Sequence, residues 1–199
     1  MDSMAAFARS TGMQVPSPPS SSQRRAELVR VHQLTDARSP GHDAQATALD
    51  ERGAWGMWQD EARVYRTHVG SVDGWIGTMK MDAAIAVATM QTQLAKRRYH
   101  QPRPFQLDPQ IQPLGPIPRD SSYPSGHAAA AAAAAGVLSE LWPEHRPHYE
   151  QLAASVEWAR VYSGVHFPSD VVAGDAVGRA AARIVGGSGR DTTPALTTA

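Results

Sequence analysis

Three separate stretches of this chain carry side chains that bind anions and transfer protons. They have the sequences KRRYHQPRP (96–104), PSGH (124–127) and RVYSGVHFPSD (160–170). Each has an ordinary explanation when taken singly, because basic residues near the end of a helix and acidic residues near its start favour the helix dipole. Together they supply what metal-free phosphoryl transfer needs: cations for the phosphoryl oxygens, histidines for attack and proton transfer, and a carboxylate.

The PSGH stretch predicts the start of a helix with an anion-binding end. Pro124 is unsuited to a helix interior, whereas the eight consecutive alanines after His127 are the best helix formers. We therefore expect Ser125 to be the N-cap residue, with its hydroxyl and the unpaired N–H groups of the first turn available to a phosphate. Gly126 has no Cβ, so a ligand can approach the backbone closely, and His127 can face the same anion.

The other two stretches contribute the cations and the carboxylate. Three basic residues are candidate ligands of the phosphoryl oxygens: Lys96, Arg103 and Arg160. Two histidines, His127 and His166, could act as nucleophile and proton donor, and Asp170 could orient one of them. The sequence has no convincing cluster of carboxylates for a catalytic metal, so we expect no metal ion in the site.

Composition limits the class of partner and leaves the compartment open. A chain of 199 residues is expected to form one domain, and 19 Lys and Arg residues balance 19 Asp and Glu residues, which does not favour nucleic acid as a partner. There is no cysteine, and no apolar run reaches the ~18 residues that span a bilayer. Arg9 interrupts the short apolar run near the N-terminus, so no signal peptide is expected in the sequence as it stands. We expect a soluble protein, cytoplasmic as the sequence stands or exported if a leader was removed.

Apolar residues at helical spacing predict a series of helices separated by proline and glycine. Residues 1–22 end in a Pro- and Ser-rich stretch typical of a flexible lead-in, and residues 186–199 form a polar tail. The domain between them covers residues 23–185. The expected helices cover residues 23–35, 49–68, 72–98, 125–142, 147–162 and 168–185, with a break at Ser39-Pro40-Gly41.

These elements predict an all-α fold, a single-domain helical bundle. No stretch alternates with the period of a strand, and small residues at 128–135 and 173–182 permit close approach of helices. The helix over 72–98 has apolar residues at helical spacing, among them Val72, Trp75 and Met79, and it ends with Lys96. Residues 99–124 contain seven prolines and one glycine. Because so long a loop is uncommon in a compact domain, its place between the basic cluster and the PSGH stretch favours a functional loop.

The three motifs resemble those of a known superfamily. The patterns Lys-x6-Arg-Pro, Pro-Ser-Gly-His and Arg-x5-His-x3-Asp are similar, in type and order, to those of type-2 phosphatidic acid phosphatases, class A nonspecific acid phosphatases and vanadium haloperoxidases. The resemblance covers residues 79–185, and the contexts of Arg103 and Ser122 are closer to the acid phosphatases. The third motif of the family usually begins with Ser-Arg, whereas here Ala159 precedes Arg160. Residues 1–70 resemble no family that we can name.

The resemblance implies the fold of the acid phosphatases and vanadium haloperoxidases, and a role for each motif residue. His166 would be the nucleophile, Asp170 would hold its other ring nitrogen, and His127 would protonate the leaving group and then activate water. The phosphate would be bound by the remaining motif residues: Lys96, Arg103, Ser125, Gly126 and Arg160. No cofactor is implied for a phosphatase. Vanadate is expected as an inhibitor, or as the prosthetic group of a haloperoxidase.

Three functions fit these motifs. The first is a metal-independent phosphatase that hydrolyses phosphomonoesters or diphosphates through a phosphohistidine. The second is a vanadium-dependent haloperoxidase, and the third is an anion-binding module without turnover, against which the full set of catalytic side chains argues.

The motifs recognise the phosphoryl group and not what it is attached to. The partner is therefore a small phosphate ester, with a lipid phosphate left open because Trp55, Trp58 and Trp75 could line an apolar groove. A homo-oligomer is also left open.

Overall fold

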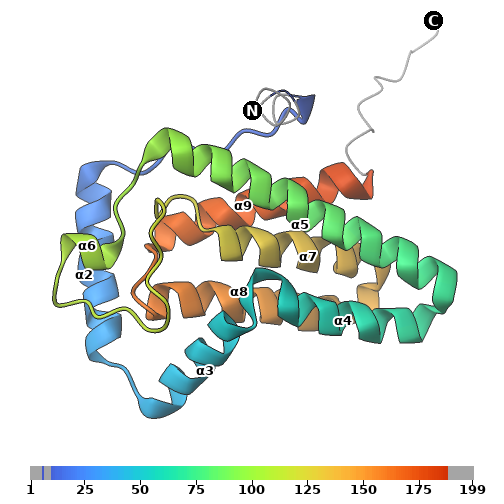
Figure 1. Ribbon diagram of the computed structural model, residues 1–199, viewed down its shortest axis with the longest axis horizontal. Helices are drawn as coiled ribbons and strands as arrows, with labels where there is room; N and C mark the ends of the chain where they lie inside the picture. The colour runs from blue at the N-terminus through green and yellow to red at the C-terminus, as the bar shows by residue number, and fades with distance from the viewer. Residues whose placement is uncertain (1–5, 7–9, 188–199) are drawn as a thin grey trace, which may run out of the picture.

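The computed structural model describes residue 6 and residues 10–187, and these form an all-α bundle (Figure 1). The described residues contain no strand, which confirms the predicted fold class. The elements are α2 (Ser21–Asp36), α3 (Pro40–Glu51), α4 (Gly53–Val69), α5 (Ser71–Tyr99), α6 (Pro104–Leu107), α7 (Gly126–Leu141), the 3-10 helix η1 (Pro143–His145), α8 (Arg146–Tyr162) and α9 (Pro168–Gly186). The predicted lead-in and tail lie in part outside the described residues, at 1–5, 7–9 and 188–199.

The alanine-rich helix α7 is the centre of the bundle, with α5, α8 and α9 packed around it. Each of its eight consecutive alanines is at most 5 % exposed. Ser125 is its N-cap, as predicted, and the Ser125 hydroxyl accepts a hydrogen bond from the N–H of Ala128 at 3.4 Å. A helix that is apolar all round is stable only when it is buried on every side. The alanine run therefore determines both the helix and its central position.

Two glycines on α9 explain how closely it packs on α7. A Cβ at Gly178 would lie 2.2 Å from the carbonyl oxygen of Ala129, and one at Gly174 would lie 2.4 Å from the carbonyl oxygen of Ser125. No side chain fits in that space, so the two backbones are in direct contact. The backbone N–H of Ser125 also donates to the carbonyl of Asp170 at 2.8 Å. The close packing thus joins the second and third sequence motifs.

Between residues 20 and 70 the structure has one more helix than the sequence pattern predicted. The expected break at Ser39-Pro40-Gly41 is instead the start of α3, because the Ser39 hydroxyl caps the helix and Pro40 occupies its first turn. Helix α2 begins two residues earlier than expected, with Ser20 as its N-cap. It lies across one end of the bundle (Figure 1), where Val31 packs against Ile111 and Phe167.

Helices α4 and α5 form an antiparallel hairpin with a turn at Gly70, whose φ is 92°. Trp58 is buried in the main core, which excludes it from any ligand groove. On α5 the buried face consists of residues such as Met81 and Ile85, whereas Met79 on the opposite face is exposed. Among the helices of the described residues, none combines the length and the apolar character needed to cross a bilayer.

The Pro-rich segment between α5 and α7 is a defined loop with one short helix, α6. Its two arms are held together where the N–H of Ser122 donates to the carbonyl of Gln101 and the Ser122 hydroxyl donates to the carbonyl of Pro102, each at 2.9 Å. Leu114 in the middle of the loop donates to the carbonyl of Ser163 at 3.0 Å. The loop therefore connects the ends of α5, α7 and α8, where the sequence motifs lie.

Candidate active site

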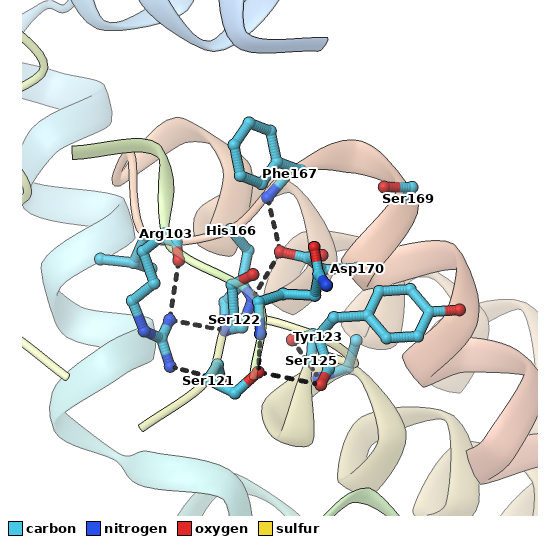
Figure 2. Close-up of polar contacts among 12 residues, drawn as sticks. Arg103, Ser121, Ser122, Tyr123, Ser125, His166, Phe167, Ser169 and Asp170 are labelled. Carbon is cyan, nitrogen blue, oxygen red and sulfur yellow. Dashed lines mark hydrogen bonds and ion pairs between the residues drawn. The ribbon is translucent and has the colours of Figure 1, made fainter. Parts of the chain in front are cut away.

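His166 and Asp170 lie side by side at the start of α9. The Nδ1 atom of His166 is 3.3 Å from one carboxylate oxygen of Asp170, and the same oxygen accepts the N–H of Phe167 at 2.9 Å (Figure 2). Pro168 begins the helix, so Asp170 falls at its third position, with its carboxylate turned back to His166. Both side chains are buried. The Nδ1 atom is therefore held by the carboxylate, which leaves Nε2 to face the other way.

Arg103 approaches His166 from the side opposite Asp170, with Nη1 3.2 Å from Nε2 (Figure 2). Four further hydrogen bonds fix its guanidinium: Nη1 to the Val165 carbonyl at 2.7 Å, Nε to the Asp120 carbonyl at 3.0 Å, and Nη2 to the Asp120 carboxylate at 2.6 Å and to the Ser121 carbonyl at 3.4 Å. Arg103 is 2 % exposed. It is thus a fixed cation directly beside Nε2 of His166.

The other two predicted cations lie near the C-terminal ends of two different helices, and both line the same pocket as Arg103. Lys96 lies in the last turn of α5, and Arg160 lies in the last turn of α8. Each has a carboxylate partner: the Nζ atom of Lys96 is 3.0 Å from Asp120, and Arg160 forms a close ion pair with Asp50. In the free protein every cation of the pocket is therefore already paired with a carboxylate.

His127 faces the pocket from the first turn of α7. Its Nε2 atom is 4.0 Å from the carboxylate of Asp50, and its side chain is 34 % exposed. Gly126 beside it also lines the pocket. Ser125 is fully buried as the cap of α7, so it supports the start of the helix. Six of the eight residues predicted from the three motifs therefore line one pocket. The other two are buried behind it, Asp170 against His166 and Ser125 at the start of α7, and the roles of all eight stay predictions.

The pocket is a partly open cleft with a volume of about 210 Å³. Its lining combines basic, acidic, histidine and apolar side chains, among them Trp55, Lys96, Arg103, Asp120, His127 and His166. Trp55 is 39 % exposed at this cleft, in contrast to the buried Trp58. Another cleft of similar size, between α7 and α9 near Ser139, is lined by none of the predicted site residues.

Burial and positive charge favour the neutral form of both histidines. Burial lowers the pKa of His127 to about 4; Arg160, Lys96 and Arg103 add to this effect, and Asp50 opposes it. Burial also lowers the pKa of His166 to about 3, although the hydrogen bond to Asp170 acts in the opposite direction. A bound dianion would favour the protonated form of either ring. The neutral ring of His166 is the form that can attack an electrophile.

Three residues of this site were not predicted from the sequence. Arg24 on α2 donates to the second carboxylate oxygen of Asp170 at 2.8 Å. Asp50 on α3 and Asp120 in the loop pair with the cations of the pocket. None of the three belongs to a motif. One weak indication was available, since a charged residue at a buried helix position requires a partner, but which position is buried depends on the tertiary structure.

The predicted motif residues thus gather at helix ends of an all-α bundle, around the pair formed by His166 and Asp170. The family model of the PAP2 superfamily matches residues 77–188, more than half of the chain's 199 residues. The chain therefore belongs to the PAP2 superfamily, as the motifs indicated. Arg24 and Asp50 lie outside the matched residues.

Relatives of known activity include a non-specific acid phosphatase of Salmonella typhi, 36 % identical over 75 % of this chain and 53 % of its own length. An undecaprenyl-diphosphatase of Sulfolobus acidocaldarius is 37 % identical over 46 % of this chain and 45 % of its own length. This chain thus spans about half the length of these relatives.

Solved structures show the same fold. A bacterial vanadium-dependent iodoperoxidase has a TM-score of 0.76, with 20 % identity over 90 % of this chain and 53 % of its own. A transmembrane PAP2-type phosphatidylglycerolphosphate phosphatase of Bacillus subtilis has a TM-score of 0.64, with 20 % identity over 96 % of both chains. These likenesses establish the fold and leave the activity to the chemistry of the site.

Proposed function

We propose that this chain is a phosphatase that hydrolyses phosphate esters through a phosphohistidine on His166. The observation that carries the proposal is the position of the His166 ring, with Nδ1 held by Asp170 and Nε2 directed at the cation Arg103. A phosphoryl group bound by Arg103 would lie next to the attacking nitrogen. The family, and relatives named as phosphatases, support the same reaction class.

In the first step Nε2 of His166 forms a bond to phosphorus while the bond from phosphorus to the ester oxygen breaks. Protonated His127 gives its proton to the departing oxygen, so an alcohol leaves. Lys96, Arg103 and Arg160 neutralise the charge on the phosphoryl oxygens, which is the role that Mg²⁺ has in other phosphoryl-transfer enzymes. Asp170 stabilises the positive charge that forms on the ring of His166.

In the second step a water molecule attacks the phosphorus and His127, now neutral, accepts its proton. The bond between phosphorus and Nε2 breaks, and the electron pair returns to the ring of His166. A ring of low basicity is a good leaving group, and burial gives His166 a low pKa of about 3. The same environment that keeps the nucleophile neutral therefore also favours release of inorganic phosphate.

The test is to trap the intermediate. Wild-type protein incubated briefly with a phosphate ester and quenched in alkali, where phosphohistidine survives, should gain the mass of one phosphoryl group on the peptide containing His166. His166→Ala should lose turnover and labelling while its circular dichroism spectrum is unchanged. His148→Ala is the control, because His148 is an exposed histidine on α8 that pairs with Glu61. A folded His166→Ala variant with wild-type turnover would exclude the mechanism.

Vanadium-dependent peroxidase activity is a second candidate, because the iodoperoxidase shares the fold. The basic residues Lys96, Arg103 and Arg160 would hold the oxygens of a vanadate anion, with His166 facing its metal. Bound vanadate would supply peroxide activation for the oxidation of halides. Iodide and bromide oxidation by the vanadate-treated protein with peroxide would support this function, and phosphate release without vanadate would support the phosphatase.

The part of the cleft around Trp55 supports a proposal on the substrate class. Trp55 gives that side of the cleft an apolar, aromatic surface, whereas Asp50 adds a negative charge near His127. We propose a monoester or diphosphate whose remaining part is uncharged near the phosphorus, with an isoprenyl or other lipid group among the options. The test is to measure the rate of phosphate release from aryl, sugar, nucleotide and isoprenyl phosphates, each in buffer with and without detergent. These rates rank the substrate classes.

A further inference from the structure

The outward face of α5 exposes large apolar side chains along a single line. Val72 is 70 % exposed, Ile76 50 % and Met79 67 %, and Ala83 and Ala86 continue the line as exposed residues. The contacts of α5 with α4, α7 and α9 involve its other faces, where Met81, Ala84, Ile85 and Ala88 are buried. Soluble proteins rarely expose a continuous apolar surface without a partner for it.

The spacing of this line is that of a helix-to-helix contact. Steps of four and three residues alternate along it, through Val72, Ile76, Met79, Ala83, Ala86 and Met90, which we call the α5 seam. Alternating steps of four and three produce the narrow stripe along which two long helices pack. With 29 residues, α5 is about 44 Å long at 1.5 Å per residue, so the seam is long enough for a stable helix pair.

We propose that the α5 seam packs antiparallel against the α5 seam of a second copy of this chain. A twofold interface requires a surface that is complementary to itself. The middle of the seam has this property, because its side chains are large, small, small and large in order: Met79, Ala83, Ala86 and Met90. Antiparallel pairing about the point midway between the two alanines places Ala83 opposite Ala86 and Met79 opposite Met90, so the backbones approach closely at the centre.

The charges at the two ends of α5 favour the same orientation. Asp73 is exposed in the first turn, and Arg97 and Arg98 are exposed in the last turn. Antiparallel pairing brings the acidic end of each copy near the basic end of the other. Parallel pairing would place like charges together at both ends, which opposes association.

The flanks of the seam favour a protein partner over a lipid surface. Asp73, Lys80 and Asp82 border the seam, so both signs of charge occur beside it. Helices that lie on membranes carry mainly Lys and Arg on the polar side and large apolar residues on the other. Small alanines in the middle of the seam suit close contact with another helix. This inference concerns assembly and does not rest on the proposed function.

Sedimentation equilibrium of the full chain over a wide concentration range tests the proposal. Wild type should be dimeric, and Ala83→Glu should raise the dissociation constant at least about tenfold, because it places an unpaired charge at the centre of the interface. The matched control is Val172→Glu on α9, since Val172 is 69 % exposed and apolar but lies off the seam. Circular dichroism confirms that each variant is folded.

Two further measurements test the orientation. The chain lacks cysteine, so mixing an Ala83→Cys variant with an Ala86→Cys variant under oxidation should give mainly the mixed disulfide dimer. Asp73→Arg should weaken the dimer, and adding Arg97→Asp with Arg98→Asp should restore it. A monomeric wild type at all concentrations would overturn the proposal. Equal dissociation constants for Ala83→Glu and wild type would also overturn it. The same holds if the wild type binds lipid vesicles as a monomer and Ala83→Glu abolishes this binding.

Discussion

Arg24 and Asp170 form a buried ion pair directly behind His166, although they are 146 positions apart in the sequence. The guanidinium also lies 4.3 Å from the centre of the Phe167 ring. Burial raises the pKa of the Asp170 carboxyl, but the His166 hydrogen bond and the charge of Arg24 outweigh it, so the pKa is below its ordinary value. Arg24 therefore keeps ionised the carboxylate that orients the nucleophile.

Removal of Arg24 should move the acid limb of the activity profile. In Arg24→Met the pKa of the Asp170 carboxyl should rise, because fewer partners then oppose the effect of burial. Once it is protonated, the carboxyl no longer accepts the hydrogen bond from Nδ1 of His166. We expect kcat/KM to fall about 10- to 100-fold at low pH, as for other residues that support a functional side chain, and the acid limb to shift to higher pH. Arg24→Lys should recover part of the loss.

The control for this prediction is Arg25→Met, which removes the exposed neighbour of Arg24 on the same helix. It should leave the pH profile and the melting temperature unchanged. Arg24→Met could instead lose the same fraction of activity at every pH, and that fraction could equal its loss of folded protein. This result would show that Arg24 has only a structural role.

Asp120 should compete with phosphate for the pocket. Its carboxylate lies 3.0 Å from Lys96 and 2.6 Å from Arg103, and it is 45 % exposed, so it can move away when an anion binds. Exposed ion pairs contribute up to about 1 kcal/mol, so Asp120→Asn should tighten inhibition by inorganic phosphate about two- to fivefold. Asp60→Asn is the control, because Asp60 is similarly exposed and paired on α4. Weaker phosphate binding by Asp120→Asn would instead identify Asp120 as a supporting residue.

The activity should have an acidic optimum in kcat/KM. His127 must carry a proton, and its pKa of about 4 means that this proton is lost as the pH rises above that value. His166 must be neutral, and it becomes protonated only below a pKa of about 3. A bound phosphoryl dianion raises the pKa of His127, so the alkaline limb of kcat should lie at higher pH than that of kcat/KM.

The measurement is the pH profile of both constants for an aryl and an alkyl phosphate. His127→Ala should remove the alkaline limb and should reduce turnover of the alkyl ester far more than that of the aryl ester, since a phenolate leaves without a proton. Equal losses on the two esters would contradict the role of His127 as the general acid.

Gly178→Ala should destabilise the bundle. The added Cβ would lie 2.2 Å from the Ala129 carbonyl oxygen, so α7 and α9 must separate. Overpacking of this kind costs about 1–3 kcal/mol in the free energy of unfolding. Gly41→Ala on α3 is the matched control, because nothing lies within 4 Å of its added Cβ, and it should stabilise by about 0.5–1 kcal/mol. Urea denaturation compares the two variants, and an unchanged midpoint for Gly178→Ala would contradict the close contact.

Activity should persist in EDTA, and vanadate should inhibit competitively. Three protein cations converge on the pocket, and among the described residues no three His, Asp or Glu side chains gather as a metal site would require. Vanadate resembles the transferring phosphoryl group and should bind more tightly than phosphate. Loss of turnover in EDTA that Mg²⁺ or Zn²⁺ restores would contradict the first expectation, and full activity at millimolar vanadate would contradict the second.

The sequence was most informative where the chemistry is local. The cap at Ser125, the helix that the alanines form and the start of α9 at Pro168 all depend on neighbours in the chain, and each was predicted correctly. The break expected at Ser39-Pro40-Gly41 does separate two helices, but the helix α3 that begins at Pro40 was not predicted. Those residue types suit a turn and a helix start equally, and packing against α8 decides between them.

The sequence by itself determined the three motifs, their order and the all-α class, because spacing along a helix fixes which side chains share a face. Only the tertiary structure decided which charges meet. Arg24, Asp50 and Asp120 come from three elements outside the motifs, and each pairs with a residue far from it in the chain. The structure also decided that the apolar line of α5 faces outward. Helical periodicity identifies an apolar face, but what that face packs against depends on how all the helices are arranged.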